Sequence, residues 1–403
     1  IVFYFLGWVL GIEGILMILP CVVALVYREP SGFYFLGVAL FCGISGWLLA
    51  HRKLKSTVFY AKEGFVAVSL SWIVLSFFGA LPFFLSEEIP LLEDALFEVI
   101  SGFTTTGASV LPDVEALSRC MLMWRSFTHW IGGMGVLVFI LAVLPLAGGY
   151  NIHIMRAESP GPSVGKLVPR VRTTAKILYL IYLFITVVQI ILLLFTGMPL
   201  FDSITLSLGT AGTGGFGIKN DSIAGYSTYC QVIITIFMIL FGINFNAYFL
   251  ILIRKFRQAW ESEEVRAYLL IIAAATLAIT FNVRGYFSSF AQAFQQTIFQ
   301  VASIITTTGY ATTNFDLWPE FSRTILVLLM FVGACAGSTG GGIKVSRFLI
   351  MLKTVKKELI QLLHPRSVRR IQIDGKAIEH EVVRSTNVYM GVYLFIFAFF
   401  GYL

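Results

Sequence analysis

Charged residues are scarce in this chain: only 13% of its 403 residues are Asp, Glu, Lys or Arg, and 57% are hydrophobic. The mean hydropathy is +0.84. Soluble globular domains carry roughly twice this share of charge, about 25%. The composition therefore excludes a sizeable water-soluble domain, and it indicates that the chain is solvated by a lipid bilayer.

Signs of catalytic and redox chemistry are also lacking. The cysteines lie in or beside apolar stretches without paired spacing, at Cys21, Cys42, Cys120, Cys230 and Cys335, and this pattern predicts neither disulfides nor a metal site. No nucleophile and base stand together, so we expect no enzyme and no cofactor. A net charge of +7 would suit nucleic acid, but the basic residues fall in short segments between apolar stretches. That is the pattern of membrane topology, and we expect no nucleic-acid partner.

Apolar stretches long enough to cross a bilayer recur along the chain. A helical crossing takes roughly 20 residues, and the candidates are 1–27, 33–50, 64–86, 118–148, 174–197, 228–253, 265–283, 321–352 and 386–403. Basic residues gather in alternate connections, which places those connections in the cytoplasm. The outward connections carry acids, among them Glu88, Asp113 and Glu115. Such acids either raise the local cation concentration or are simply solvated.

Three segments of the chain align with one another. They run from Asp94 to Gly107, from Asp202 to Gly215 and from Gln296 to Gly309, and each places a glycine thirteen positions after a polar residue. The first and third share the run Thr-Thr-Thr-Gly. Each segment is too short to cross a bilayer and lies between two apolar stretches. A re-entrant loop, in which a half-helix descends into the membrane and ends at the Thr/Gly run, satisfies these constraints.

The Thr/Gly runs suit a dehydrated cation. Acids at the start of the first two half-helices stabilise the positive N-terminal ends of these helices. The negative C-terminal ends then point at the pore. Glycine lets successive carbonyls turn toward the axis, threonine adds hydroxyl oxygens, and rings of such oxygens replace hydration water. Small residues also serve close helix packing, but a shared register in three segments favours the pore.

These residues resemble the Trk/Ktr/HKT superfamily of potassium transporters, and within it the bacterial Trk membrane subunits. The motifs that carry the resemblance are Ser101-Gly-Phe-Thr-Thr-Thr-Gly-Ala108, Trp130-Ile-Gly-Gly-Met-Gly135, Arg156-Ala-Glu-Ser-Pro-Gly-Pro162, Gly214-Gly-Phe216, Thr306-Thr-Thr-Gly-Tyr310 and Gly333-Ala-Cys-Ala-Gly-Ser-Thr-Gly-Gly-Gly-Ile-Lys344. Together they extend over most of the chain. The stretches before the first repeat fit the Trk subunit better than the shorter Ktr one.

The resemblance implies an all-α polytopic membrane protein with helix–pore loop–helix repeats around a pseudo-symmetric pore and two extra N-terminal helices. We expect the divisions 1–60, 61–155, 156–258, 259–363 and 364–403, the last an incomplete fourth repeat, so we expect a truncated chain. It also implies a homodimer in the bacterial cytoplasmic membrane, a cytoplasmic regulatory subunit that binds NAD or ATP, and potassium as the transported substrate. The implied filter is Thr104, Thr105, Thr106, Gly107, Ala211, Gly212, Thr213, Gly214, Gly215, Thr306, Thr307, Thr308 and Gly309. In the family a serine at the first glycine position accompanies sodium preference, so Gly107 implies potassium.

A glycine-rich run interrupts the apolar stretch 321–352. It resembles a nucleotide-binding P-loop, but the lysine comes one position late and Val345 stands where Ser or Thr should ligate magnesium. Glycines at 337, 340, 341 and 342 should break the helix, which lipid tolerates only where the backbone is buried or lines a cavity. We expect a passive kink or, as the family implies, an intramembrane gate: Gly337, Ser338, Thr339, Gly340, Gly341, Gly342 and Lys344.

Charged and amide side chains within the apolar stretches need partners. Arg125 and His129 share a helix face, and Glu98 on the first half-helix is the expected partner of Arg125. We expect this pair to brace the first pore loop, because a cation on the conduction path would repel potassium. Asn244 and Asn246 either bond between helices or wet the inner vestibule.

Two other functions compete with a channel-like potassium pore. A secondary transporter would bind its substrate at broken helices near the membrane midplane, but such proteins usually show paired broken helices and not Thr/Gly loops in one register. A receptor or scaffold without transport does not account for that register. Ion flux in liposomes separates the three.

Overall fold

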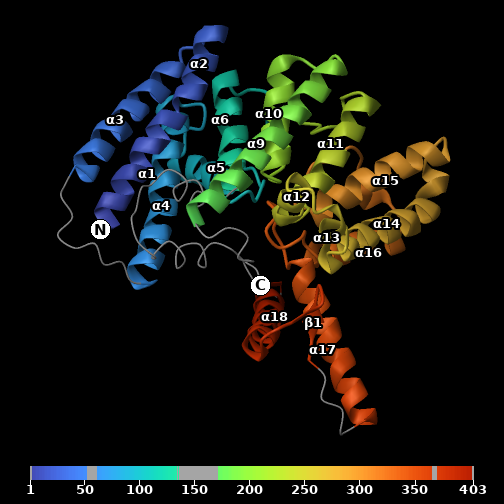
Figure 1. The fold of residues 1–403 in the computed structure, drawn as a ribbon. Coiled ribbons are helices and arrows are strands. Elements are labelled where there is room, and N and C mark those ends of the chain that lie inside the picture. The colour runs from blue at the N-terminus through green and yellow to red at the C-terminus, as the bar shows by residue number, and fades with distance from the viewer. Residues whose placement is uncertain (1, 52–60, 134, 136–170, 365–369, 402–403) are drawn as a thin grey trace.

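The computed structural model describes residues 2–51, 61–133, 135, 171–364 and 370–401. Within these residues the chain is mostly helical, and its short helices lie between longer ones (Figure 1). The only sheet among them is a two-stranded hairpin of β1 (Gln372–Ile373) and β2 (Lys376–Ala377). The predicted helical class is therefore confirmed.

An N-terminal hairpin precedes the repeats. Helix α1 (Val2–Leu16) continues past Met17 into α2 (Ile18–Tyr27), and α3 (Gly32–Ala50) packs back along α1. The outer end of this hairpin is fastened to the rest of the molecule by carboxylates. Glu29 accepts the amides of Arg119 and Cys120, each at 2.9 Å, and the Ser31 hydroxyl donates to Glu88 at 2.5 Å.

A long helix, a short helix and a further helix then follow one another three times. The first set is α4 (Ala61–Leu85), α5 (Leu92–Phe103) and α6 (Arg119–Gly133). The second is α9 (Val171–Phe195), α10 (Leu200–Ala211) and α11 (Thr228–Phe241) with α12 (Phe245–Leu252), followed by the short α13 (Phe256–Trp260). The third is α14 (Glu263–Val283) with η1 (Arg284–Tyr286), α15 (Phe290–Ile305), η2 (Phe315–Leu317) and α16 (Glu320–Phe331) with α17 (Val345–Leu363). The chain then enters the β hairpin and α18 (His380–Gly401).

Among the described residues, six helices are long and apolar enough to cross a membrane. They are Val2–Tyr27, Gly32–Ala50, Phe65–Leu85, Lys176–Phe195, Glu263–Tyr286 and His380–Phe400. The expected stretch 118–148 is described only up to 133 and at 135. Two of the expected stretches are not continuous helices, and the break in the second was predicted from its glycines. The stretch 228–253 bends by 90° between α11 and α12, and 321–352 is broken between α16 and α17.

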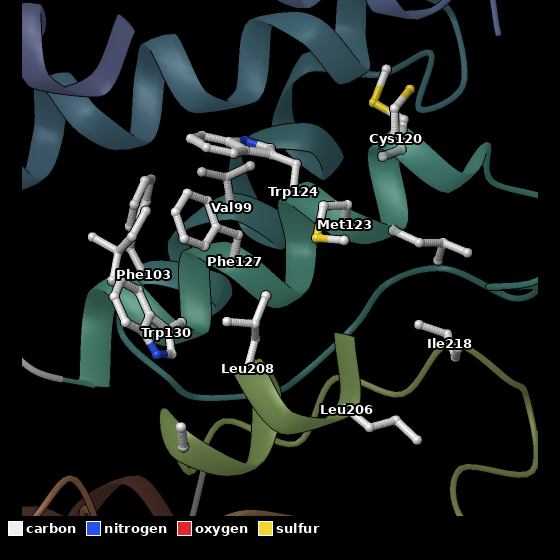
Figure 2. Close-up of a cluster of buried hydrophobic side chains, with 14 of the residues drawn as sticks. Val99, Phe103, Cys120, Met123, Trp124, Phe127, Trp130, Leu206, Leu208 and Ile218 are labelled. Carbon is white, nitrogen blue, oxygen red and sulfur yellow. The ribbon is translucent and has the colours of Figure 1, made fainter. Parts of the chain in front are cut away.

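Helix α6 forms the centre of the first two repeats. Every residue from Cys120 to Ile131 is buried, although the helix carries polar and charged side chains. Figure 2 shows Trp124, Phe127 and Trp130 of α6 gathered with Val99 and Phe103 of α5 and with Leu208 of α10. The Trp124 indole donates to the Gly79 carbonyl of α4 at 3.0 Å. This packing fixes two of the short helices relative to each other.

Candidate functional site

The three short helices α5, α10 and α15 end in the same backbone turn. In each, one amide donates three residues back and the next donates five residues back, as in a Schellman motif. The bonds are Thr105 N to Gly102 O and Thr106 N to Ser101 O, Thr213 N to Thr210 O and Gly214 N to Gly209 O, and Thr307 N to Ile304 O and Thr308 N to Ser303 O. The sequence register found in the three segments thus corresponds to one repeated conformation.

The residue that reverses the chain in each turn is a threonine. Thr105, Thr213 and Thr307 have φ values of 54°, 51° and 57°, although this left-handed position is usually taken by glycine. A β-branched residue there is unusual and strained, by roughly 1–3 kcal/mol. Strain repeated at one register in three segments indicates that the turn is required for function rather than for stability.

Two residues further on, each segment reaches its glycine. Gly107, Gly215 and Gly309 have φ values of 74°, 80° and 86°, which a side chain rarely adopts. The backbone therefore enters the left-handed region at alternate residues, at the threonine and again at the glycine. In known cation filters, backbone carbonyls that line the pore axis replace the hydration water of the ion, and this winding is compatible with such a role.

The segments touch one another through these glycines. A Cβ built on Gly107 would lie 1.9 Å from the Gly214 carbonyl oxygen, and one on Gly215 would lie 1.8 Å from that of Thr308. Nothing lies within 4 Å of a Cβ on Gly309. The first, second and third segments are therefore neighbours in chain order, packed backbone to backbone, and the expected filter residues come together in one place.

The threonine hydroxyls were expected to serve as oxygen ligands of the ion, but several of them donate to carbonyls of their own helices. Thr104 and Thr306 donate to the carbonyls of Ile100 and Ala302, at 2.7 and 2.6 Å. Their hydroxyls also lie 2.8 and 2.7 Å from those of Thr106 and Thr308. The second segment has Gly212 and Gly214 at these positions. This arrangement favours backbone carbonyls over side-chain hydroxyls as ion ligands.

Acidic side chains lie at the outer ends of two of the short helices. Glu93 and Asp94 lie in the first turn of α5, and Asp202 lies in that of α10, where carboxylates oppose the positive end of the helix dipole. The Thr/Gly segments carry no charged side chain. Helices oriented in this way direct their negative ends toward the segments, which suits a cation.

The two side chains expected to pair behind the first segment do lie together. Arg125 Nη2 is 2.5 Å and its Nε 2.7 Å from Glu98 Oε1, and both side chains are buried. Arg125 also donates to the Gly217 carbonyl at 3.2 Å and lies over the Phe216 ring, 4.1 Å from its centroid. The pair thus joins α5 and α6 to the chain just after the second segment.

His129 supports the second segment from behind. Its ring stacks on Phe216 with centroids 4.1 Å apart, and its Nδ1 is 3.4 Å from the Phe216 amide, which donates to it. A Cβ on Gly214 would lie 2.4 Å from the imidazole. His129 is therefore packed against the second Thr/Gly segment. It shares a face of α6 with Arg125, as their spacing of four residues indicated.

The glycine-rich run forms a loop between α16 and α17. Its two ends are joined by the Gly333 amide, which donates to the Ile343 carbonyl at 2.9 Å. The Lys344 ammonium donates to the Gly340 carbonyl across the loop. Gly337 and Gly342 each have a φ of 69°. The predicted break in the helix is therefore present. The residues expected to form the gate, 337–342 and Lys344, lie together in this loop.

This loop is bonded to the bend between α11 and α12. Cys335 N donates to Gly242 O at 3.0 Å, and Phe245 N donates to Gly337 O at 2.9 Å. Asn244 caps α12, because its side chain accepts the Asn246 amide at 2.9 Å. The Asn244 side chain also hydrogen-bonds to Glu264 of α14, which agrees with the expected bond between helices, and the cap is a second role that sequence reasoning did not anticipate.

Glu264 is a buried contact of the loop that sequence reasoning missed. Its Oε1 accepts the Ala336 amide at 2.7 Å and the Ser346 amide at 3.0 Å. One carboxylate thus holds the chain on both sides of the glycine-rich run. The only signal in the sequence is an acid at the start of an apolar helix, which normally indicates no more than a favourable helix N-terminus.

The fold and this arrangement define a class of membrane protein in which re-entrant half-helices converge on uncharged backbone segments, the class of cation-conducting pores. Comparison with known proteins agrees. The family model TrkH, described as a cation transport protein, matches residues 33–402. The chain belongs to the TrkH family, which also confirms the prediction of a transporter rather than an enzyme.

Individual relatives match over nearly the whole chain. The Trk system potassium uptake protein TrkH of Salmonella typhimurium is 38% identical over 396 residues, which cover 94% of this chain and 80% of the relative. That of Vibrio parahaemolyticus is 36% identical over 406 residues, covering 97% and 82%. The crystal structure of the potassium transporter TrkH from Vibrio parahaemolyticus superimposes with a TM-score of 0.87 at 32% identity, covering 98% of this chain and 83% of that one.

Proposed function

We propose that this chain is the membrane subunit of a potassium uptake system and forms a channel-like pore in the bacterial cytoplasmic membrane, which it crosses several times. The observation that carries the proposal is the repeated turn of the three Thr/Gly segments, packed backbone to backbone. Relatives at 38% and 36% identity are named Trk system potassium uptake proteins. Potassium is the transported substrate, and no cofactor is needed.

The filter in this proposal consists of the carbonyls around Gly107, Gly215 and Gly309. Because the segments touch through these glycines, a change in one moves its neighbour. The glycine-rich loop is the gate, since it lies against the third segment and is joined to it by a hydrogen bond between Thr307 and Gly341. The ion pair of Glu98 and Arg125 is structural.

The proposed partners are a second copy of the chain and a cytoplasmic regulatory subunit that binds NAD or ATP. Relatives are named as parts of a Trk system, which supports partners of this kind. Helix α17 extends from the loop away from the helical body (Figure 1) and carries several lysines, Lys353, Lys356 and Lys357. Helix α17 is therefore a suitable contact surface for a cytoplasmic partner.

Ion flux tests the proposal. Full-length protein in liposomes should pass potassium or rubidium faster than sodium, and at rates that continue to rise with the ion gradient, as expected of a pore. A secondary transporter built on the broken helices would instead saturate and depend on a second solute. Absence of potassium flux from liposomes that contain folded protein would refute the proposed function.

A further inference from the structure

The hydroxyls of the strained threonines are not used alike. Thr213 donates to its neighbour's carbonyl, Gly212 O, at 2.7 Å. Thr307 makes the same bond to Thr306 O at 2.7 Å, but its oxygen also accepts the Gly341 amide at 2.7 Å. Of the three equivalent threonines, Thr307 is the one with a described hydrogen bond to the glycine-rich loop.

The loop is pressed against the third segment at this point. A Cβ built on Gly341 would lie 2.9 Å from Thr307 Oγ1, and one on Gly340 would lie 3.1 Å from the Thr306 carbonyl oxygen. The hydrogen bond between the Gly341 amide and the Thr307 oxygen is part-buried. Because a part-buried amide that loses its acceptor costs free energy, this hydrogen bond favours the observed position of the loop.

We propose that Thr307 is a positioning residue that fastens the glycine-rich loop to the third filter segment, and that this bond must break before ions pass. The inference rests on the proposed function, in which the loop is the gate. It adds that the residue which holds the loop closed belongs to the filter itself.

Substitution at equivalent positions isolates this bond. Thr307→Val keeps the size and branching of the side chain but removes both hydroxyl bonds, whereas Thr213→Val removes only the bond within its own segment. Thr307→Ser retains a hydroxyl. In full-length protein in liposomes without partners, Thr307→Val should raise rubidium flux roughly two- to tenfold above Thr213→Val, the effect of losing one hydrogen bond, and Thr307→Ser should restore the parent rate. Equal fluxes in the two valine variants would overturn the proposal.

A reversible cross-link tests the same contact without relying on a hydrogen-bond deletion. A Cβ on Gly341 would lie 3.6 Å from Thr307 Cβ, within the range of roughly 3.5–4.5 Å found in disulfides. Thr307→Cys with Gly341→Cys, in a protein whose five native cysteines are replaced by serine, should therefore form a disulfide.

Oxidation of this double variant should stop rubidium flux, and a reductant should restore it, while each single cysteine variant should not respond. Flux that persists through a fully formed disulfide would show that the loop need not leave Thr307. Failure of the disulfide to form would show that the contact is absent. Either result overturns the inference alone, whereas absence of flux from the parent protein would count against the proposed function.

Discussion

Breaking the buried pair of Glu98 and Arg125 should destabilise the protein strongly. The side chains are only 0% and 2% exposed. In Arg125→Ala, the Glu98 carboxylate would keep only the Ser109 hydroxyl at 3.0 Å and the Val110 amide at 3.3 Å as partners. In Glu98→Gln, the guanidinium would keep a neutral amide oxygen, the Gly217 carbonyl and the Phe216 ring, but it would lose the opposite charge.

A buried ion that loses its partner costs roughly 3–5 kcal/mol. Each single variant should therefore lose about that much stability. The double variant should lose less than the sum of the two, because residues in contact are not additive and the coupling reaches about 0.5–3 kcal/mol. A matched control is Arg257→Ala, which removes an exposed pair with Glu261 whose side chains are 89% and 52% exposed. Such a pair contributes at most about 1 kcal/mol.

Unfolding in detergent, followed by tryptophan fluorescence, measures these differences in stability. The ratio of potassium to sodium flux, measured on the same samples, reports the selectivity of the filter. The reasoning would be refuted if Arg125→Ala were as stable as the parent and changed selectivity alone. Strict additivity in the double variant would also refute it, because it would mean that the two charges do not stabilise each other.

Two further predictions concern the glycine-rich loop. Deleting part of the run 337–342, while leaving the third Thr/Gly segment intact, should raise flux and weaken its dependence on a cytoplasmic partner with little change in selectivity; lost selectivity with flux still regulated would place this run in the filter. Glu264→Gln should raise basal flux about two- to tenfold, because a weaker acceptor would hold the two sides of the loop. The neighbouring Glu263→Gln, which faces Lys353 and Asp374, should leave basal flux at the parent level, and equal flux in both variants would exclude a role for Glu264 in holding the loop.

The repeats were predictable because they are local. A half-helix, its acidic start and its Thr/Gly end lie within fourteen residues of one another, and glycine at a fixed register signals a backbone constraint directly. The break in 321–352 followed for the same reason. The local sequence could not indicate that a threonine is the turn residue of each segment (Thr105, Thr213 and Thr307), because threonine normally avoids left-handed conformations.

The contacts that hold the loop depend on the tertiary fold. Glu264 meets the Ala336 and Ser346 amides across 72 and 82 residues of chain, and a single sequence contains no record of such a pairing. The outer acids illustrate the same limit. Glu88 was expected to enrich cations or to be solvated, but it accepts the Ser31 hydroxyl at 2.5 Å and the Ser118 amide at 2.8 Å. These bonds attach the N-terminal hairpin, and nothing in the sequence indicated this contact.

The central claim is that backbone segments packed through glycine select the ion, and Gly107→Ser in the full-length protein tests it most directly. The serine Cβ would meet the Gly214 carbonyl at 1.9 Å, so both segments must shift. A Cβ on Gly43 of α3 meets nothing within 4 Å, which makes Gly43→Ser the matched control. In liposomes, the parent and Gly43→Ser should prefer potassium over sodium equally, and the preference of Gly107→Ser should fall roughly tenfold, a loss of about 1.4 kcal/mol. An unchanged permeability ratio in folded, conducting Gly107→Ser protein would contradict the account.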